Sequence, residues 1–347
     1  MAPEIHPPSV IPQPHCVFIA GPTAVGKSEI ALQLAERIGG EIISVDSMQV
    51  YRGLDIGTAK PSASDRARIP HHLIDICDLI ESFDAAKFAR LAHRAANEIQ
   101  ARGHVPILCG GTGLYFKAFL EGLDEMPAAD ARLRAELEAM PLQELLEELR
   151  ESDPATYQKI DRKNPRRVIR AIEVIRLTGK PVSAQKSQQS EPIGKPKAGP
   201  LHCDDRRAQR AVPAKTHFFV FTRQSDDLRR RIDVRVDGMF ARGLVDETHE
   251  LLKRGLEQNK TAMQAIGYRQ VVKHLRGDFN LAETIELVKT RTRQFAKRQL
   301  TWFRARKNVE WVELKPEVSL ESAATTLHEA IWKVPNLKSK PCHLGSW

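Results

Sequence analysis

The sequence predicts an α/β fold in which helices flank a parallel sheet and a small all-helical domain is inserted. Three features of the 347 residues support this prediction. Short apolar runs alternate with helical patterns in the first third, a glycine-rich loop joins the first run to the first helix, and a charged, leucine-rich stretch then interrupts the alternation. Strands that alternate with helices pair in parallel, and ligands bind where those strands end.

The glycine-rich loop fits the pattern G-x-x-x-x-G-K-[ST]. In this pattern, backbone N–H groups surround phosphate oxygens, the lysine neutralises their charge, and the hydroxyl binds Mg²⁺. An apolar run at residues 16–20 precedes the loop, and apolar residues recur at helical spacing after it. This context predicts a sheet like that of the P-loop NTPases and a phosphate site made by Gly21, Pro22, Thr23, Ala24, Val25, Gly26, Lys27 and Ser28.

The remaining elements follow in order along the chain. Strands are predicted at 41–45, 105–109, 216–221 and 309–313, and helices at about 84–101, from 114 onwards, and between 222 and 303. Residues 16–126 and 216–316 therefore form the two parts of one core, and 127–182 form the helical insertion. We expect a disordered tail at 1–15, a flexible linker at 183–215 and a C-terminal tail at 317–347.

Asp46 ends the second predicted strand, beside the phosphate loop. Three roles are consistent with this position: the carboxylate caps the following turn, holds Mg²⁺ through water, or acts as a general base on a nucleophile. The following residues, Ser47 and Gln49 among them, supply hydrogen-bonding groups suited to a flat polar ligand. Spacing alone does not choose among the three roles.

Composition favours a reduced, cytoplasmic protein. Hydrophobic residues make up 41% of the chain and charged residues 28%, and no apolar run approaches the length of a membrane span. The five cysteines are scattered, and none forms a C-x-x-C pair, so neither a disulfide framework nor a zinc site is indicated.

The net charge of +9 is concentrated in clusters. Basic residues occur without intervening acids from 291 to 307, where Trp302 and Phe303 accompany them, and further clusters lie at 162–170 and 223–235. Grouped arginine and lysine with aromatics are typical of a surface that binds nucleic acid. For a single cluster, a solvated helix face explains the pattern equally well.

Several strings in the chain resemble those of the tRNA dimethylallyltransferases. They are the phosphate loop, Asp-Ser-Met-Gln-Val-Tyr at 46–51, Asp-Ile-Gly-Thr-Ala-Lys-Pro at 55–61, Gly-Gly-Thr-Gly-Leu-Tyr at 110–115, Asn-Pro-Arg-Arg at 164–167 and Gly-Tyr-Arg-Gln at 267–270. The phosphate loop is common to many families, whereas the strings at 46–51 and 55–61 are far more specific. The resemblance extends over about residues 16–312.

The resemblance implies a reaction. Members of this family transfer a dimethylallyl group from dimethylallyl diphosphate to N6 of the adenosine 3′ of the anticodon, position 37, in tRNAs that read codons beginning with U. The phosphate loop would then bind the diphosphate leaving group, with Mg²⁺ on Ser28. Asp46 would accept the N6 proton, and Thr23 and Arg223 would contact the diphosphate.

The resemblance also implies a monomer that binds the tRNA anticodon stem-loop and no membrane. The tRNA contacts that it implies are Asp46, Ser47, Met48, Gln49, Thr112, Arg134, Arg166, Arg167, Arg170, Gln264, Gly267, Tyr268 and Arg269. For Arg134 and Arg170, a surface ion pair is the competing interpretation.

Two other enzymes remain as alternatives. One is a prenyltransferase that acts on free adenine nucleotides, and the other is an ATP-binding P-loop kinase of small molecules. The basic clusters and the helical insertion favour a polymeric acceptor over both. A non-enzymatic RNA-binding P-loop switch is a weaker alternative.

Overall fold

The computed structural model describes residues 16–123, 127, 130–187 and 216–332. It divides into two compact units, Met1–Gly122 with Arg206–Trp347 and, separately, Leu123–Asp205. The tail expected at 1–15 lies outside the described residues, as do residues 188–215 of the expected linker.

The first unit is built on a six-stranded parallel sheet in the order β3-β2-β4-β1-β5-β6. The strands are β1 Cys16–Ala20, β2 Gly40–Val45, β3 His71–His72, β4 Val105–Gly110, β5 Thr216–Thr222 and β6 Glu310–Glu313. The predicted α/β fold with a parallel sheet is confirmed. Strand β3 was not predicted, because two residues are too short to produce a recognisable alternation.

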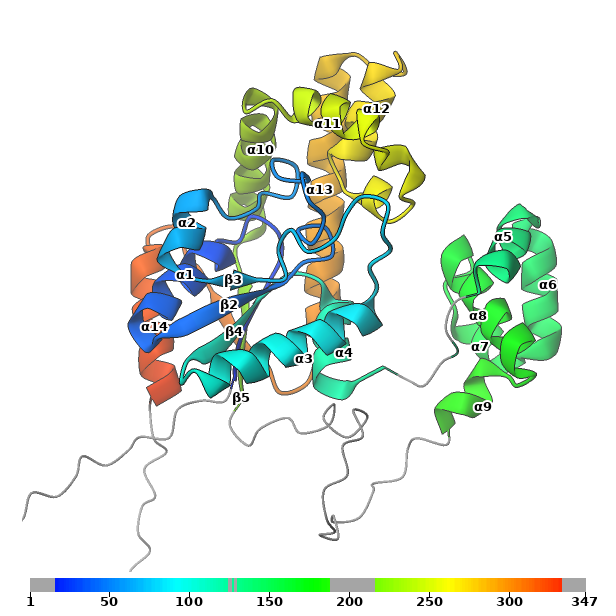
Figure 1. The fold of residues 1–347 in the computed structure, drawn as a ribbon, viewed down its shortest axis with the longest axis horizontal. Helices are drawn as coiled ribbons and strands as arrows, with labels where there is room; N and C mark the ends of the chain where they lie inside the picture. The colour runs from blue at the N-terminus through cyan, green and yellow to red at the C-terminus, as the bar shows by residue number, and fades with distance from the viewer. Residues whose placement is uncertain (1–15, 124–126, 128–129, 188–215, 333–347) are drawn as a thin grey trace, which may run out of the picture. The chain divides into compact units, whose positions relative to one another are not determined.

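Alternate residues of β1 face opposite layers of helices. Val17 and Ile19 pack with α1 (Lys27–Ile38) and α14 (Leu320–Trp332), whereas Phe18 packs with α3 (Ala85–Ala101) and α4 (Gly113–Glu121). Figure 1 shows α1 and α14 on one side of the sheet and α3 and α4 on the other. The sheet is therefore buried on both faces, as parallel sheets require.

Four further helices pack against one another and extend the core on the α3 side. They are α10 Ser225–Ala241, α11 Leu244–Lys253, α12 Tyr268–Leu275 and α13 Leu281–Arg304. Between them lie short 3₁₀ turns at Leu256–Gln258 and Ala262–Gln264, and α2 (Ala63–Arg68) precedes β3. Figure 1 shows α10 to α13 as one group.

The prediction of a tail from 317 onwards was wrong for residues 320–332, which form α14. This helix packs along α1, with Ala324 and Leu327 buried against it. The apolar residues at 320, 323, 324, 327 and 331 have the i, i+3, i+4 spacing of an amphipathic helix, a signal that the sequence does carry.

The second unit contains only helices in its described part: α5 Ala131–Ala139, α6 Leu142–Ser152, α7 Pro154–Lys159, α8 Pro165–Thr178 and α9 Val182–Ser187. Its apolar core includes Leu137, Leu145, Leu149, Val168 and Ile172. The expected linker begins later than predicted, because Val182 is buried in this core and the Ser183 hydroxyl donates to the buried carboxylate of Asp153 at 2.7 Å.

Candidate active site

The loop between β1 and α1 has the geometry of a phosphate-binding loop. Gly26 precedes α1 with φ of 108°, and Ala24 also has a positive φ, 64°. A Cβ on Gly21 would lie 2.8 Å from the carbonyl oxygen of Phe221, so only glycine fits where the loop passes β5. The amides of the first turn of α1 are left for a ligand, as at other helix N-termini.

Two arginines hold the outer side of this loop. Arg223 donates from Nε to the carbonyl oxygen of Val25 at 2.8 Å, and Arg231 donates from Nε to that of Ala24 at 2.9 Å. Arg223 also donates from Nη1 to Asp227 at 2.9 Å and is 8% exposed. The structure thus gives Arg223 a role in shaping the loop; its predicted contact with a diphosphate stays a prediction.

Positive charge is concentrated around the loop. A cavity of about 590 Å³ is lined by Lys27, Ser28, Arg230, Arg231 and Arg235, among other residues. Burial lowers the pKa of Lys27 and of Arg235. Repulsion from Arg235 lowers the Lys27 pKa further and repulsion from Arg242 lowers that of Arg235, while Asp46 opposes both shifts. Closely spaced cations in a partly desolvated site repel one another, so binding of a multiply charged anion is favoured there.

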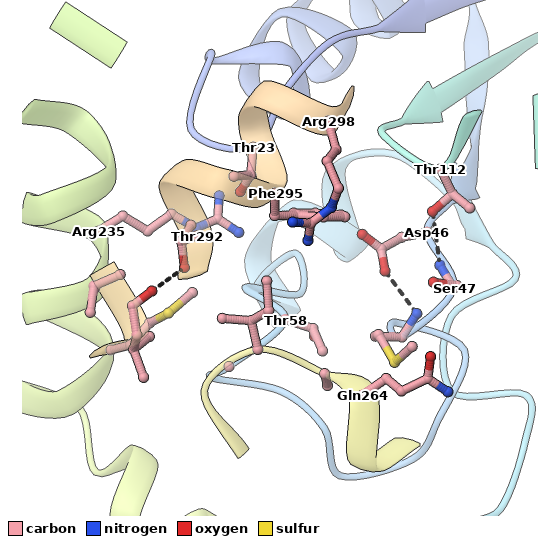
Figure 2. A pocket seen from close by; sticks show the side chains of 17 residues that line it. Thr23, Asp46, Ser47, Thr58, Thr112, Arg235, Gln264, Thr292, Phe295 and Arg298 are labelled. Carbon is pink, nitrogen blue, oxygen red and sulfur yellow. Dashed lines mark hydrogen bonds between the residues drawn. The ribbon is translucent and has the colours of Figure 1, made fainter. Parts of the chain in front are cut away.

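Asp46 lies in an adjoining cavity of about 330 Å³ (Figure 2). Its Oδ1 accepts hydrogen bonds from the amides of Met48 at 2.8 Å and Gln49 at 3.3 Å, so the carboxylate does cap the following turn. The amide of Ser47 donates to Thr112 Oγ1 at 3.3 Å. The capping bonds orient the Asp46 carboxylate toward the cavity, which leaves the general-base role open to it.

Thr23 and Arg235 connect the two cavities. Thr23 belongs to the phosphate loop yet lines the cavity of Asp46, and Arg235 lines both cavities. Figure 2 shows the Arg235 and Asp46 side chains entering the cavity from opposite sides. The structure therefore brings together six of the predicted site residues in one cavity: Thr23, Asp46, Ser47, Met48, Thr112 and Gln264.

Gln49 lies outside this cavity. Its Oε1 accepts from the Ser44 hydroxyl at 2.8 Å, and its Nε2 donates to the carbonyl oxygens of Thr58 and Ala59 at 3.2 and 3.3 Å. These bonds join the end of β2 to the following loop. Gln49 is therefore a structural residue in this conformation, and its predicted tRNA contact is not supported by its position.

The predicted tRNA contact of Tyr268 is not supported by its position and stays a prediction, because the side chain is fully buried. Its hydroxyl donates to Glu247 at 2.6 Å and accepts from the amide of Gly57 at 3.0 Å. Gly267 is also buried, whereas Arg269 and Gln264 are exposed. Tyr268 thus supports the loop that carries Gly57 and Thr58 into the cavity wall.

Arg134 and Arg170 both pair with Glu173, which is fully buried in the second unit. The Arg170–Glu173 distance is 2.6 Å, and Arg170 Nη2 donates to the carbonyl oxygen of Pro127 at 2.7 Å. Both arginines therefore form ion pairs, as the competing interpretation holds, but their partner Glu173 is buried and does not lie at the surface. Arg166 and Arg167 are exposed at the start of α8.

Eleven of the 17 residues that line the cavity are not among the predicted site residues, and four of these are Arg235, Thr292, Phe295 and Arg298. Three of them are on α13, where Figure 2 shows Phe295 and Arg298 on the side of the cavity that faces Asp46. Val288, Thr292 and Phe295 are spaced by four and three residues, so the sequence marks one face of this helix but not what the face contacts.

Two findings bear on metals and membranes. Among the described residues, no group of three His, Cys, Asp or Glu side chains is placed to hold a metal ion. None of the helices in the described part of the chain has both the length and the apolar composition of a membrane span.

Comparisons with known proteins agree with the geometry. The profile of the IPP transferase family matches residues 49–306. The tRNA dimethylallyltransferase of Geobacter metallireducens is 45% identical over 304 residues, which cover 86% of this chain and 92% of that protein. The tRNA dimethylallyltransferase of Halorhodospira halophila is 47% identical over 291 residues, 82% of this chain and 88% of that protein.

Solved structures are similar as well. The tRNA isopentenylpyrophosphate transferase of Bacillus halodurans is 40% identical, with a TM-score of 0.64 over 91% of this chain and 95% of that one. A eukaryotic dimethylallyltransferase acting on tRNA is 28% identical, with a TM-score of 0.73 over 91% of this chain and 77% of that one. The resemblance predicted from the sequence is confirmed: the chain belongs to the IPP transferase family.

Proposed function

We propose that this chain transfers a dimethylallyl group from dimethylallyl diphosphate to N6 of adenosine 37 in tRNAs that read codons beginning with U. One observation carries the proposal: the cavity of Asp46 adjoins the phosphate loop, and Thr23 and Arg235 line its wall. A carboxylate at one end and a cluster of cations at the other suit a proton acceptor and an anionic leaving group. Most of the relatives that support it are named for this activity.

In the proposed reaction, N6 of adenine attacks C1 of the dimethylallyl group. The C1–oxygen bond breaks, and its electron pair leaves with the diphosphate. Lys27, Arg235 and the loop amides stabilise the charge on the departing oxygens. Asp46 accepts the proton that N6 loses, a task for which a positioned base contributes about 10² to 10⁴ in rate.

Mg²⁺ fits this site as an ion shared with the substrate. The Ser28 side chain is exposed at the first turn of α1, where the diphosphate would supply further oxygen ligands. Magnesium keeps several waters and binds substrate phosphates with few protein ligands. When bound, it would neutralise charge on the diphosphate.

Adenosine 37 must leave the anticodon stack to reach Asp46, as base-modifying enzymes require. Exposed Gln264 lines the cavity, exposed Arg269 follows it by five residues, and Arg166 and Arg167 of the second unit offer further cationic groups. We propose that these residues hold the anticodon stem-loop. We further propose that the chain acts as a monomer on cytoplasmic tRNA.

The test supplies purified protein, Mg²⁺ and dimethylallyl diphosphate with tRNA that lacks this modification. We expect mass spectrometry of nuclease fragments to find one added C5 unit on the nucleoside next to the anticodon. Transfer to AMP but not to tRNA would indicate the free-nucleotide enzyme. Phosphate transfer from ATP would indicate the kinase.

A further inference from the structure

Gln299 on α13 connects two loops that come from different strands. Its Oε1 accepts a hydrogen bond from the amide of Thr23 at 2.9 Å, and its Nε2 donates to the carbonyl oxygen of Gly111 at 3.0 Å. The side chain is 7% exposed. Both polar atoms of this buried amide are therefore used, one on each loop.

Gly111 leaves space for this contact. A Cβ on Gly111 would lie 2.1 Å from Gln299 Nε2, far inside contact distance, so any other residue would displace the amide. The bond to Gly111 and the absence of a side chain there are thus two independent signs that the amide is closely fitted between the loops.

The two hydrogen bonds of Gln299 lie beyond the ends of the strands, where no sheet hydrogen bonds join the two loops. The ladder between β1 and β4 ends at the pair Ala20↔Gly110, and Thr23 and Gly111 both lie beyond it. Past this point, the Gln299 side chain ties the phosphate loop to the loop after β4.

The second loop leads directly to Asp46. Thr112 follows Gly111, and its hydroxyl accepts from the amide of Ser47, the residue after Asp46. A continuous series of hydrogen bonds and peptide links thus runs from Thr23 through Gln299 and Thr112 to Asp46. The first end belongs to the proposed leaving-group site and the last to the proposed base.

We infer that Gln299 is a positioning residue that fixes the distance between the diphosphate site and Asp46. The separation between the two sites affects the rate only if the enzyme joins a substrate bound at one site to a substrate bound at the other. The role of Gln299 therefore rests on the function proposed above. Reacting atoms must approach to about 3–3.5 Å, and a displacement of 1 Å can lower the rate about 10²-fold. An amide suits this position because it accepts from one loop and donates to the other.

The test compares steady-state kinetics of tRNA prenylation for wild type, Gln299→Met, Gly111→Ala and Gln294→Met. Methionine matches the length of glutamine but makes neither strong hydrogen bond. We expect Gln299→Met to lower kcat about 10- to 100-fold, with KM for both substrates within about threefold of wild type. Gly111→Ala should reproduce this loss by displacing the amide. Gln294→Met, on the exposed face of the same helix, is the matched control and should behave as wild type.

A pH series on Gln299→Glu separates positioning from general folding. The protonated acid can accept from Thr23 and donate to Gly111, as the amide does, whereas the carboxylate would meet the Gly111 carbonyl oxygen with like charge. Burial raises the pKa of a carboxyl group. We therefore expect the kcat of Gln299→Glu, divided by that of wild type at the same pH, to rise as pH falls from 8 to 6. The corresponding ratio for Gln299→Met should stay constant.

Three results would overturn the assignment: a wild-type kcat in Gln299→Met, a loss confined to KM, or a ratio for Gln299→Glu that does not change with pH. If Gln299→Met fails to fold, the Gln299→Glu series decides alone. An inactive wild type would refute the proposed function itself, whereas an active wild type with an unaffected Gln299→Met would refute only the role of the bridge.

Discussion

Arg223 donates a hydrogen bond to the carbonyl oxygen of Val25 at 2.8 Å, although 198 positions separate the two residues in the chain. The guanidinium is buried, and it also donates to Asp227, which is 9% exposed. A buried cation thus holds the backbone of the phosphate loop from behind, and the carboxylate of Asp227 holds the cation.

We predict that Arg223→Met weakens both the fold and the binding of dimethylallyl diphosphate. The substitution removes the buried partner of Asp227 and retains its ion pair with the exposed Arg230, a loss of about 3 kcal/mol in the free energy of unfolding. Arg230→Met is the matched control and should cost below about 1 kcal/mol. Urea denaturation and calorimetric titration of the donor would measure the two effects, and equal effects of both substitutions would contradict this role.

Asp46→Asn should lower kcat about 10²- to 10⁴-fold without weakening donor binding. Asparagine keeps an Oδ1 that accepts from the amides of Met48 and Gln49, so the turn is retained while the basic carboxylate is removed. Single-turnover experiments should therefore show a lower rate for Asp46→Asn, whereas donor titration should show an unchanged dissociation constant. Loss of Mg²⁺-dependent donor binding in Asp46→Asn would instead assign the carboxylate to the metal.

Tyr268→Phe and Arg269→Ala should separate structure from RNA binding at neighbouring positions. Removing the buried hydroxyl deprives Glu247 and the Gly57 amide of their hydrogen bonds to Tyr268, so Tyr268→Phe should cost about 1–3 kcal/mol of stability. Arg269 is exposed, so its removal should leave stability unchanged, weaken tRNA binding and reduce its salt dependence. Thermal denaturation and filter binding at several salt concentrations test the pair. A stable Tyr268→Phe that has lost tRNA affinity would restore the original prediction for this tyrosine.

Stability should fall in acid through Glu41, which is 3% exposed and accepts from Arg102 and His72 at 2.7 Å each. Burial alone would raise the Glu41 pKa, but the hydrogen bonds from Arg102 and His72 outweigh it, and the pKa lies below its ordinary value of 4.5. A lowered pKa in the folded state stabilises the protein above pH 4.5, and this contribution is lost as pH falls through the folded-state value.

The corresponding variant is Glu41→Gln. It should be less stable than wild type by about 1.5–3 kcal/mol at pH 7, and the difference should shrink as pH falls below 4.5. Urea denaturation at pH 7, 5, 4 and 3 measures this. Glu98→Gln, which removes an exposed partner of Arg94, serves as control and should change stability less at every pH. A difference for Glu41→Gln that persists unchanged at pH 3 would contradict the assignment.

The sequence predicted the elements whose signal is local. The phosphate loop, the strands around it and Asp46 at the end of β2 carry short patterns, and the shared edge of a parallel sheet brings Asp46 and Thr112 together without further information. The helical insertion was visible in its leucine spacing. These features needed neither long-range contacts nor side-chain packing.

The residues that sequence reasoning misplaced depend on long-range contacts. Nothing near Tyr268 indicates that Glu247 and Gly57 enclose it. Glu173 follows Arg170 by only three residues, but its second partner, Arg134, is 39 residues away in the chain. The basic run at 291–307 is divided in the same way: Arg293 pairs with Asp233 and Arg306 with Glu121, while Phe303 lies in the core. A cluster of charges in sequence therefore overstates the charge available to a partner.

The position of β5 beside β1 has a consequence for the order in which the protein is made on the ribosome. Residues 16–122 supply β1 to β4, but β1 stays an edge strand until residues 216–222 emerge, after the whole of the second unit. Arg223, Arg231 and Gln299, which hold the phosphate loop, follow later still. A nascent chain would thus expose one unpaired side of an apolar strand for more than ninety codons of synthesis, an interval in which chaperones would protect it from pairing with another chain.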